Sequence, residues 1–341
     1  KKAASQHELY MEIMVLPDNA YSTTFASTIK HAHHFSEKKQ LLLSLPSFQK
    51  NVGHTIEESR LILKKTRQIL HCKTQPDVAA CQIKIKFQYY VLREQPLDNM
   101  FAQALNGFAA ASRSSDIVGV NLVQAEDGPI SMRDYDKHMQ IFKFLHHAYP
   151  QVSIALHAGE ILPQQLNHQA KNHIYNAIFT GQAKRIGHGV DILSEEHATS
   201  LLDYMAKNSI PVEINLTSNK TILNVAGVEH PLTHYLAHHV PVVLSTDDEG
   251  ILRTNLTHEY VTAVLEHHLD YASIKNLNRN TLTYSFIPGK SIWLDAQKNI
   301  RVSACKDFSS MACQRFIQQN EKAKLQLLLE KNLAQFEKKY T

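Results

Sequence analysis

One short stretch decides how this chain folds: Val152-Ser-Ile-Ala-Leu-His-Ala-Gly-Glu160. It begins as an aliphatic run and ends in polar and glycine residues, which is typical of a buried parallel strand. The same pattern recurs in six further runs, at Leu9–Leu16, Ile83–Leu92, Ile117–Leu122, Arg185–His188, Val212–Leu216 and Val242–Ser245. The sequence therefore predicts seven parallel strands.

Helical patterns lie between these runs, with starts at Ser131, for a helix to about Ala148, and at Ser194, for a helix through Met205. Alternating strands and helices indicate βαβ units, and no G-x-G-x-x-G opens a helix, so we predict an α/β (β/α)8 TIM-type barrel over a doubly wound sheet. An eight-stranded barrel needs one more strand than the seven runs supply. We expect this first strand ahead of Glu8.

The chain has no internal repeat and no linker composition, so we predict a single domain over residues 1–341. A helical elaboration is expected at about residues 22–70. The C-terminal helical region, about residues 270–341, follows a helix around His258–Leu269; it holds a Tyr284–Gly289 loop and a charged helix near Ser309–Tyr340.

The composition narrows the class of partner. Hydrophobic residues make up 43% and charged residues 20% of 341, which excludes a disordered or low-complexity chain. The net charge of +4 is scattered, and no run of 18 apolar residues occurs, so neither a nucleic acid nor a membrane is the expected partner. We expect a small-molecule substrate, and the oligomeric state stays open.

The four cysteines form two close pairs in sequence, Cys72 with Cys81 and Cys305 with Cys313. Two local disulfides would suit an oxidising compartment, periplasmic or extracellular, whereas four free thiols would suit a cytosolic enzyme. The chain has 21 histidines, so imidazole and carboxylate are the expected ligands of any bound metal.

Titratable residues gather where three predicted strands end: His157-Ala-Gly-Glu160, Gly187-His188-Gly189 and Ser245-Thr-Asp247-Asp248. Strand ends of one barrel share the face that binds substrate. His157 and Asp247 are the candidate ligands of a catalytic zinc ion, Zn2+, because an imidazole nitrogen and a carboxylate oxygen suit this metal. Glu160, His188 and Asp248 are the candidate general acid and base groups.

Each of these residues also has a structural interpretation. His188 could be a hydrogen-bonded core histidine, and Glu160 could cap a helix. The Asp247-Asp248 pair could begin the following helix, where the macrodipole favours carboxylates. Three clusters at the ends of three different strands favour the catalytic interpretation.

These motifs resemble those of the adenosine deaminase family of metal-dependent barrel hydrolases. Further similar stretches are Val118–Val123 followed by Glu126-Asp-Gly128, Val212–Asn219 and Arg279–Gly289, and they look closest to the adenosine deaminase growth factor branch and its bacterial relatives. The resemblance implies hydrolytic deamination at C6 of a purine nucleoside, with zinc activating water. It implies that His157 and Asp247 ligate the metal, Glu160 protonates the purine ring, His188 takes the water's proton and Asp248 contacts the purine.

Two features depart from the family pattern. The family's first strand ends in a His-x-His pair, so two further histidine ligands are expected upstream of Lys1; His31-Ala-His33 has the right letters but follows the second strand of the barrel. The family also has a glycine that meets the purine where this chain has Gln124, a candidate substrate contact. The alternatives are therefore a deaminase of adenine or an N6-substituted purine, and an inactive nucleoside-binding or signalling module.

Overall fold

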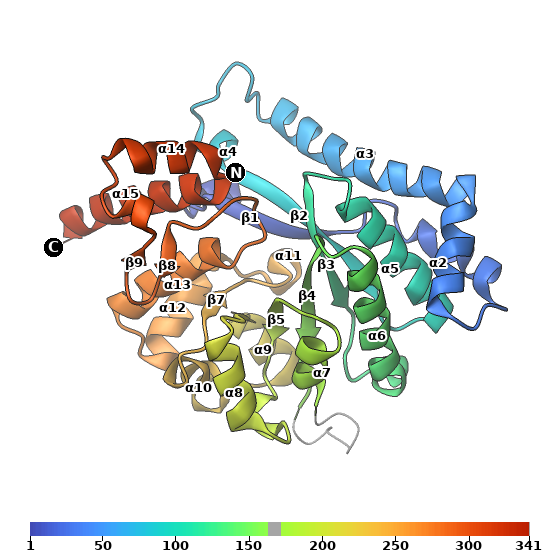
Figure 1. Cartoon of the computed structure of the whole chain (residues 1–341). Helices are drawn as coiled ribbons and strands as arrows, with labels where there is room; N and C mark the ends of the chain where they lie inside the picture. Colours follow the sequence, from blue (N-terminus) through green and yellow to red (C-terminus); the bar gives the residue numbers. More distant parts are fainter. Residues whose placement is uncertain (163–171, 341) are drawn as a thin grey trace.

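The computed structural model describes residues 1–162 and 172–340, and its centre is a curled sheet of seven parallel strands (Figure 1). Every strand run predicted from the sequence is present. The strands are β1 Tyr10–Val15, β2 Lys84–Leu92, β3 Ile117–Val123, β4 Ser153–Ala158, β5 Arg185–His188, β6 Val212–Ile214 and β7 Val242–Leu244.

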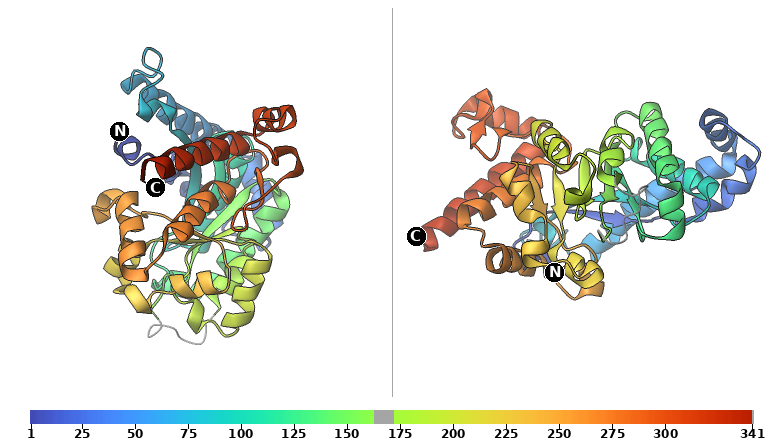
Figure 2. Two further views of the ribbon diagram at one scale, coloured as in Figure 1. Left: turned by 90° about the vertical axis from the view of Figure 1, so that its left-hand side faces the viewer. Right: turned by 90° about the horizontal axis from the view of Figure 1, so that it is seen from below.

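The strands pair in chain order, each with the next, from β1 to β7. This order confirms the TIM-type α/β fold, because a doubly wound sheet changes direction along its strand order. Within the described residues, β1 and β7 are the two edges of the sheet. Figure 2 shows the sheet curling between these edges, with helices on its outer side.

Helices follow the strands, and most of them cover the outside of the sheet. They are α5 Leu97–Ala111, α6 Pro129–Ala148, α7 His173–Phe179, α8 Ala198–Lys207, α9 Leu216–Leu223, α10 Leu232–Ala237, α11 Glu249–Leu252, α12 Leu256–His267 and α13 Tyr271–Thr283. Short 3-10 turns, η3 Ile192–Ser194 and η4 Gly227–Glu229, join some of them. None of the helices described for this chain has both the length and the apolar composition needed to cross a membrane.

Several predicted boundaries differ from the structure, and three of them have a clear local cause. Helix α6 begins at Pro129 and not at Ser131, because proline fixes a helical φ and lacks the amide that a first turn leaves unpaired. Ser194 closes the η3 turn, and the helix starts later, at Ala198. Strand β6 ends at Ile214, since Asn215 is already the N-cap of α9.

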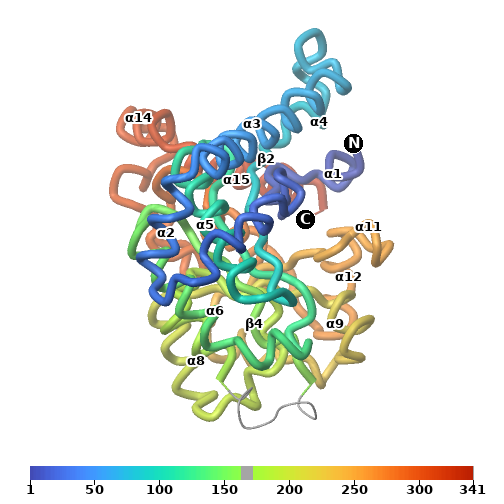
Figure 3. Tube along the Cα trace, turned by 90° about the vertical axis from the view of Figure 1, so that its right-hand side faces the viewer, coloured from blue at the N-terminus to red at the C-terminus, as the bar shows by residue number. Residues whose placement is uncertain are grey.

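The 22–70 elaboration is helical, as predicted, and consists of η1 Tyr21–Ile29, α2 Phe35–Ser44 and α3 Pro46–Ile69. It lies outside α5, which is buried along most of its length (Figure 3). Asp18 joins this layer to the sheet, because its carboxylate accepts hydrogen bonds from Tyr89 Oη at 2.9 Å and Asn51 Nδ2 at 3.0 Å. Between α3 and β2, short helix α4 Ala79–Gln82 carries Cys81, which forms a disulfide with Cys72.

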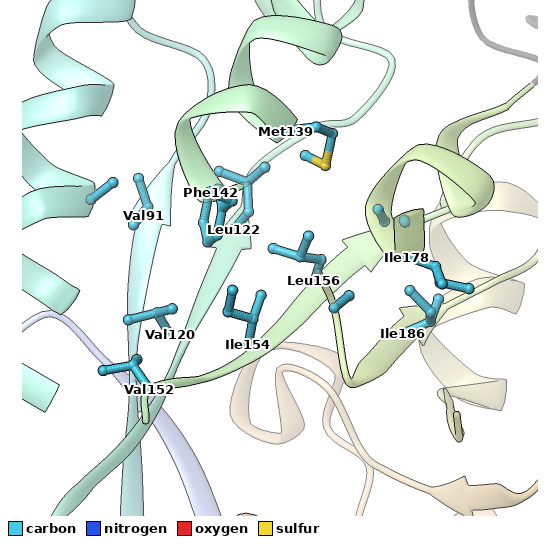
Figure 4. Packing of buried hydrophobic residues seen from close by; sticks show 14 of the residues in the cluster. Val91, Val120, Leu122, Met139, Phe142, Val152, Ile154, Leu156, Ile178 and Ile186 are labelled. Carbon is cyan, nitrogen blue, oxygen red and sulfur yellow. The ribbon is translucent and has the colours of Figure 1, made fainter. Parts of the chain in front are cut away.

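The hydrophobic core lies between the sheet and its outer helices (Figure 4). On β4, Ile154 and Leu156 face α6 and are fully buried, as alternation along a strand requires. His157 has the opposite parity, so its side chain lies on the inner face of the curled sheet. One strand thus supplies core packing on one face and a chemical group on the other.

The C-terminal region forms a second, smaller apolar cluster that includes Trp293, Cys305 and Cys313. The two cysteines form a disulfide. A hairpin of β8 Trp293–Asp295 and β9 Ile300–Arg301 and the turn η5 Ser303–Cys305 precede α14 Met311–Gln319 and α15 Glu321–Tyr340; α1 Lys2–Ser5 begins the chain.

The single helix predicted near Ser309–Tyr340 was wrong, because Asn320 interrupts it with an extended backbone. The Asn320 side chain accepts a hydrogen bond from the Lys290 amide at 2.7 Å, and the Asn320 backbone packs so closely on Gly289 that a Cβ there would lie 2.9 Å from Asn320 Cα. The interruption at Asn320 therefore allows the chain at Gly289 and Lys290 to pack against the junction of α14 and α15. Helix α13 was not predicted separately from its neighbour α12.

Candidate active site

Two of the three polar strand ends predicted from the sequence line one pocket of about 880 Å³, and His188 of the third lies directly behind His157. The β4–β5 register places His157 opposite Gly187, and Ala158 opposite His188, so the two histidines end adjacent strands. The pocket extends across the sheet from β1 to β7. Its lining includes Gln124, His157, Glu160, Asp247 and Asp248.

His157 presents one ring nitrogen to this pocket with a free lone pair. Its Nδ1 lies 3.0 Å from Asn121 Oδ1, which also accepts the backbone amide of Leu122 at 2.8 Å. That amide can only donate, so the Asn121 oxygen is fixed and His157 Nδ1 carries the proton. Burial and the charge of neighbouring His188 lower the pKa of His157 to about 3, so the ring is neutral and its Nε2 is available to a metal.

His188 is fully buried beside it, with the two ring centroids 4.9 Å apart. Its Nε2 lies 3.8 Å from Asp247 Oδ2 and has no hydrogen-bond partner among the described residues. Its Nδ1 lies 2.9 Å from Asn219 Nδ2. His188 is therefore a hydrogen-bonded core histidine on one side and an unpartnered polar group toward the cluster on the other.

Asp247 completes a cluster that could hold a metal ion. One ligand atom each from His157, His188 and Asp247 lie within 4.8 Å of one another. The Asp247 carboxylate is also held by the protein, because Ser218 Oγ donates a hydrogen bond to Asp247 Oδ2 at 2.7 Å. This donor set of imidazole and carboxylate groups suits zinc. The buried Nε2 of His188 has no hydrogen-bond partner among the described residues, so the protein groups of the cluster leave one polar atom for a bound species.

Glu160 reaches this cluster from the loop after β4. Its Oε1 lies 3.6 Å from His188 Nδ1. Burial raises the pKa of Glu160. The charge of His188 lowers this pKa and the negative charge of Asp247 raises it, and the net effect is a raised pKa. A raised pKa favours the protonated carboxyl that a general acid needs. Residues 160–162 are not helical, and residues 163–171 lie outside the described part of the chain, so the helix-cap interpretation of Glu160 stays untested.

The backbone around Glu160 is held by Glu126, which is fully buried. Its Oε1 accepts from the Gly159 amide at 3.1 Å and from His173 Nδ1 at 2.6 Å, and its Oε2 accepts from the Glu160 amide at 2.9 Å. Burial alone would raise its pKa, but the hydrogen bond from His173 and the charge of Arg93 outweigh burial and lower the pKa to about 2. An ionised Glu126 thus fixes the loop that carries Glu160.

Asp248 and Gln124 lie at the rim of the pocket. Asp248 is exposed and occupies the N-cap position of α11, although its side chain makes no cap hydrogen bond. Burial and the neighbouring Asp247 raise its pKa. Gln124 is also exposed, and its Oε1 accepts from the Glu94 amide at 2.9 Å. His31 and His33 lie exposed between η1 and α2 and do not line the pocket.

Three of these positions have left-handed backbone conformations, with φ of 81° at Gln124, 67° at His188 and 52° at Asp247. Non-glycine residues seldom adopt this region, and it clusters at functional sites because it re-aims side chains. His188 has the same strand parity as buried Ile186, and its left-handed φ interrupts that alternation. The strained backbone therefore contributes to bringing the ring beside His157.

Sequence reasoning did not identify the residues that hold these groups. Asn121, Glu126, Ser218 and Asn219 all contact a predicted site residue, yet none was expected to. The available signal was their position, since all four lie inside stretches that were noted only for their resemblance to the family. Their partners come from other strands and could not be read from spacing.

Comparisons with known proteins identify the family of this chain. The family model described as Adenosine deaminase matches residues 49–293. The adenosine deaminase of Edwardsiella ictaluri is 36% identical over 135 residues, covering 39% of this chain and 38% of that protein. The adenosine deaminase of Vibrio cholerae is 31% identical over 180 residues, covering 52% of this chain and 49% of that protein. The matched region therefore spans less than half the length of these relatives.

Two solved structures have a similar fold. An adenine deaminase from Arthrobacter aurescens has a TM-score of 0.51 at 16% identity, covering 84% of this chain and 95% of its own. A zinc-bound amidohydrolase from Burkholderia ambifaria has a TM-score of 0.55 at 13% identity, covering 96% of this chain and 72% of its own. Because the sequence identities are this low, the likeness to these two structures shows a shared fold alone.

Proposed function

Because the chain belongs to the adenosine deaminase family, we propose that it hydrolyses adenosine, or a closely related purine nucleoside, at C6. Water replaces the amino group, and the products are the inosine-type nucleoside and ammonia. The observation that carries the proposal is the convergence of His157, His188 and Asp247 within 4.8 Å, with Glu160 3.6 Å from His188. Metal ligands, a buried imidazole and a protonated carboxyl are the groups that such a hydrolysis requires.

The metal in this proposal is zinc, held by His157 and Asp247. A zinc ion held there would supply a nucleophilic water at neutral pH. His157 suits this role because Asn121 fixes its proton on Nδ1, and Asp247 suits it because Ser218 orients its carboxylate. Two further histidine ligands are proposed to come from a strand between edges β1 and β7, both of which line the pocket.

The remaining groups act on the purine and on the water. Glu160 is proposed to donate a proton to the ring nitrogen next to C6, since burial raises its pKa and so favours the protonated carboxyl. Asp248 is proposed to contact the purine from the pocket rim, and Gln124 to face it from the end of β3. His188 is proposed to contact the attacking water through Nε2, the nitrogen without a partner in the described part of the chain.

The test is Glu160→Gln in the full chain, with turnover followed by the ultraviolet absorbance change of adenosine. We expect activity to fall by a factor on the order of 10² to 10⁴, which is the contribution of a positioned general acid. Glu57→Gln is the matched control, because Glu57 is exposed on α3 and pairs only with Arg60 in the described contacts. Near-parental activity in Glu160→Gln would refute the assignment.

A substrate panel decides between the nucleoside and the other purines. Adenosine, adenine and an N6-substituted purine differ in the ribose and in the leaving group, while the ring nitrogen that Glu160 would protonate is common to all three. Turnover of adenosine without turnover of adenine supports a nucleoside enzyme. Turnover of adenine alone, or binding of adenosine without turnover, would replace the proposal with one of the two alternatives.

We also propose that the protein works in an oxidising compartment, periplasmic or extracellular. Two local disulfides, Cys72–Cys81 and Cys305–Cys313, support this. Mass spectrometry of the native protein with and without reduction tests it, since four alkylatable thiols before reduction would contradict it.

A further inference from the structure

A chain of hydrogen bonds with a fixed direction runs behind His188. It begins at the backbone amide of Leu232, which donates to His230 Nδ1 at 3.2 Å. A backbone amide can only donate, so His230 Nδ1 is an acceptor and carries no proton. Burial lowers the pKa of His230 to about 3, so the ring is neutral and its proton sits on Nε2.

Asn219 links His230 to His188 and keeps the same donor-to-acceptor direction along the chain of hydrogen bonds. His230 Nε2 lies 3.0 Å from the Asn219 side chain, and its N–H must meet the carbonyl oxygen there. The amide nitrogen of Asn219 therefore points the other way, and it lies 2.9 Å from His188 Nδ1. A donor at this distance requires that His188 Nδ1 accept.

A second amide supports the same polarity. Asn215 Nδ2 donates to the backbone oxygen of Glu213 at 3.4 Å, and the same nitrogen lies 3.3 Å from His188 Nδ1. Glu160 Oε1 is the nearest acceptor on that side, at 3.6 Å, beyond hydrogen-bond distance. On the other side of the ring, Nε2 faces Asp247 Oδ2 at 3.8 Å. Both sides of the ring favour a proton on Nε2.

We propose that Asn219 and His230 are positioning residues that hold the His188 ring with Nδ1 as an acceptor and a proton on Nε2, so that this nitrogen donates a hydrogen bond into the cluster. The inference rests on the proposed function for its chemical meaning. A His188 that donates at Nε2 holds and polarises the attacking water, whereas the proton-accepting role expected from the family resemblance needs the opposite tautomer.

The same geometry separates the two histidines of the cluster. His157 Nδ1 faces a fixed oxygen of Asn121, which leaves its Nε2 unprotonated, as a metal ligand must be. His188 Nδ1 faces a fixed nitrogen of Asn219, which leaves a proton on its Nε2. Asn121, fixed by the Leu122 amide, and Asn219, fixed by His230, thus make His157 the ligand and His188 the hydrogen-bond donor.

The test is the ring ¹⁵N spectrum of the full, metal-free chain with labelled histidine, at a pH about two units above the ordinary histidine pKa of about 6.5. The His188 signals are assigned by their loss in His188→Asn. We expect His188 to be protonated at Nε2 and His157 at Nδ1. Protonation of His188 at Nδ1 in the parent protein would overturn the proposal, whatever its activity toward purines.

The variant Asn219→Asp reverses the polarity, because a carboxylate accepts from both His230 Nε2 and His188 Nδ1. We expect the His188 proton to appear on Nδ1, and the turnover number for a purine substrate to fall on the order of a hundredfold with little change in KM. Asn224→Asp is the matched control, since Asn224 is exposed at the C-cap of α9. A tautomer unchanged in folded Asn219→Asp would refute the inference.

The readouts keep this inference separate from the proposed function. If no purine is turned over but the spectra show the two opposite tautomers, the function is wrong and the positioning stands. If adenosine is deaminated but His188 carries its proton on Nδ1, the function stands and the positioning is wrong.

Discussion

The buried carboxylate of Glu126 should stabilise the folded chain through its charge, and Glu126→Gln is the substitution that measures this. In the native structure it accepts hydrogen bonds from His173 Nδ1 and from the amides of Gly159 and Glu160, and it lies 3.8 Å from Arg93 Nη1. Glutamine keeps the shape but offers one accepting oxygen in place of two. It therefore leaves an amide donor facing N–H groups and leaves Arg93 without its counterion.

The magnitude follows from the pKa. Lowering the pKa of Glu126 from its ordinary 4.5 to about 2 corresponds to about 3 kcal/mol of stabilisation of the ionised form, at about 1.4 kcal/mol for each pKa unit. Removing one partner of a buried ion pair costs about 3 to 5 kcal/mol. The two estimates agree, so we expect Glu126→Gln to lose about 3 kcal/mol of unfolding free energy at pH 7.

The pH dependence gives the sharper test. Because the folded pKa is depressed, the stabilisation is present above the ordinary pKa and is lost as pH falls toward 2. The difference between parent and Glu126→Gln, measured by urea unfolding with disulfides intact, should shrink by about 1 kcal/mol between pH 4.5 and pH 3.5. Glu57→Gln should show no such change. A difference below about 1 kcal/mol at pH 7, or one independent of pH, would refute the reasoning.

Two further predictions concern other groups of the same region. Glu195 accepts the Ile174 amide at 2.6 Å, yet burial raises its pKa to about 7; stability is therefore lost as pH rises from about 4.5 to about 7. Glu195→Gln should flatten this fall by up to about 1 kcal/mol per pH unit in urea titrations, and parallel parent and variant curves would contradict it. His157→Ala should lower the zinc content of the full chain, measured by elemental analysis after dialysis, whereas equal zinc in parent and variant would remove His157 from the ligand set.

The strands and the three polar strand ends could be predicted because each is encoded within a few consecutive residues. His157 and Glu160 follow one aliphatic run, and Asp247 and Asp248 follow another, so spacing alone placed them at one face. Their convergence is confirmed by the shared pocket. The roles assigned to them stay predictions until the variants above are measured.

What the sequence did not reveal depends on contacts between distant elements. Asn121 acts on His157 across 36 positions, and Asn219 acts on His188 across 31. The helix break at Asn320 depends on the Lys290 amide, which no local propensity encodes. Local pattern fixes which residues face the pocket, whereas the hydrogen-bond partners of those residues follow only from how strands and helices are placed.

The left-handed backbone at Gln124, His188 and Asp247 has a consequence for stabilising this protein by design. Each such residue costs about 1 to 2 kcal/mol relative to a relaxed conformation, and glycine would remove most of that cost. Eleven further non-glycine residues in the described part of the chain have a positive φ, so the positions where glycine would stabilise the chain include the three that shape its pocket. A search for thermostable variants that selects on unfolding temperature alone would accept glycine at these three strand ends together with the other positions, and at these three the gain would come with loss of the site.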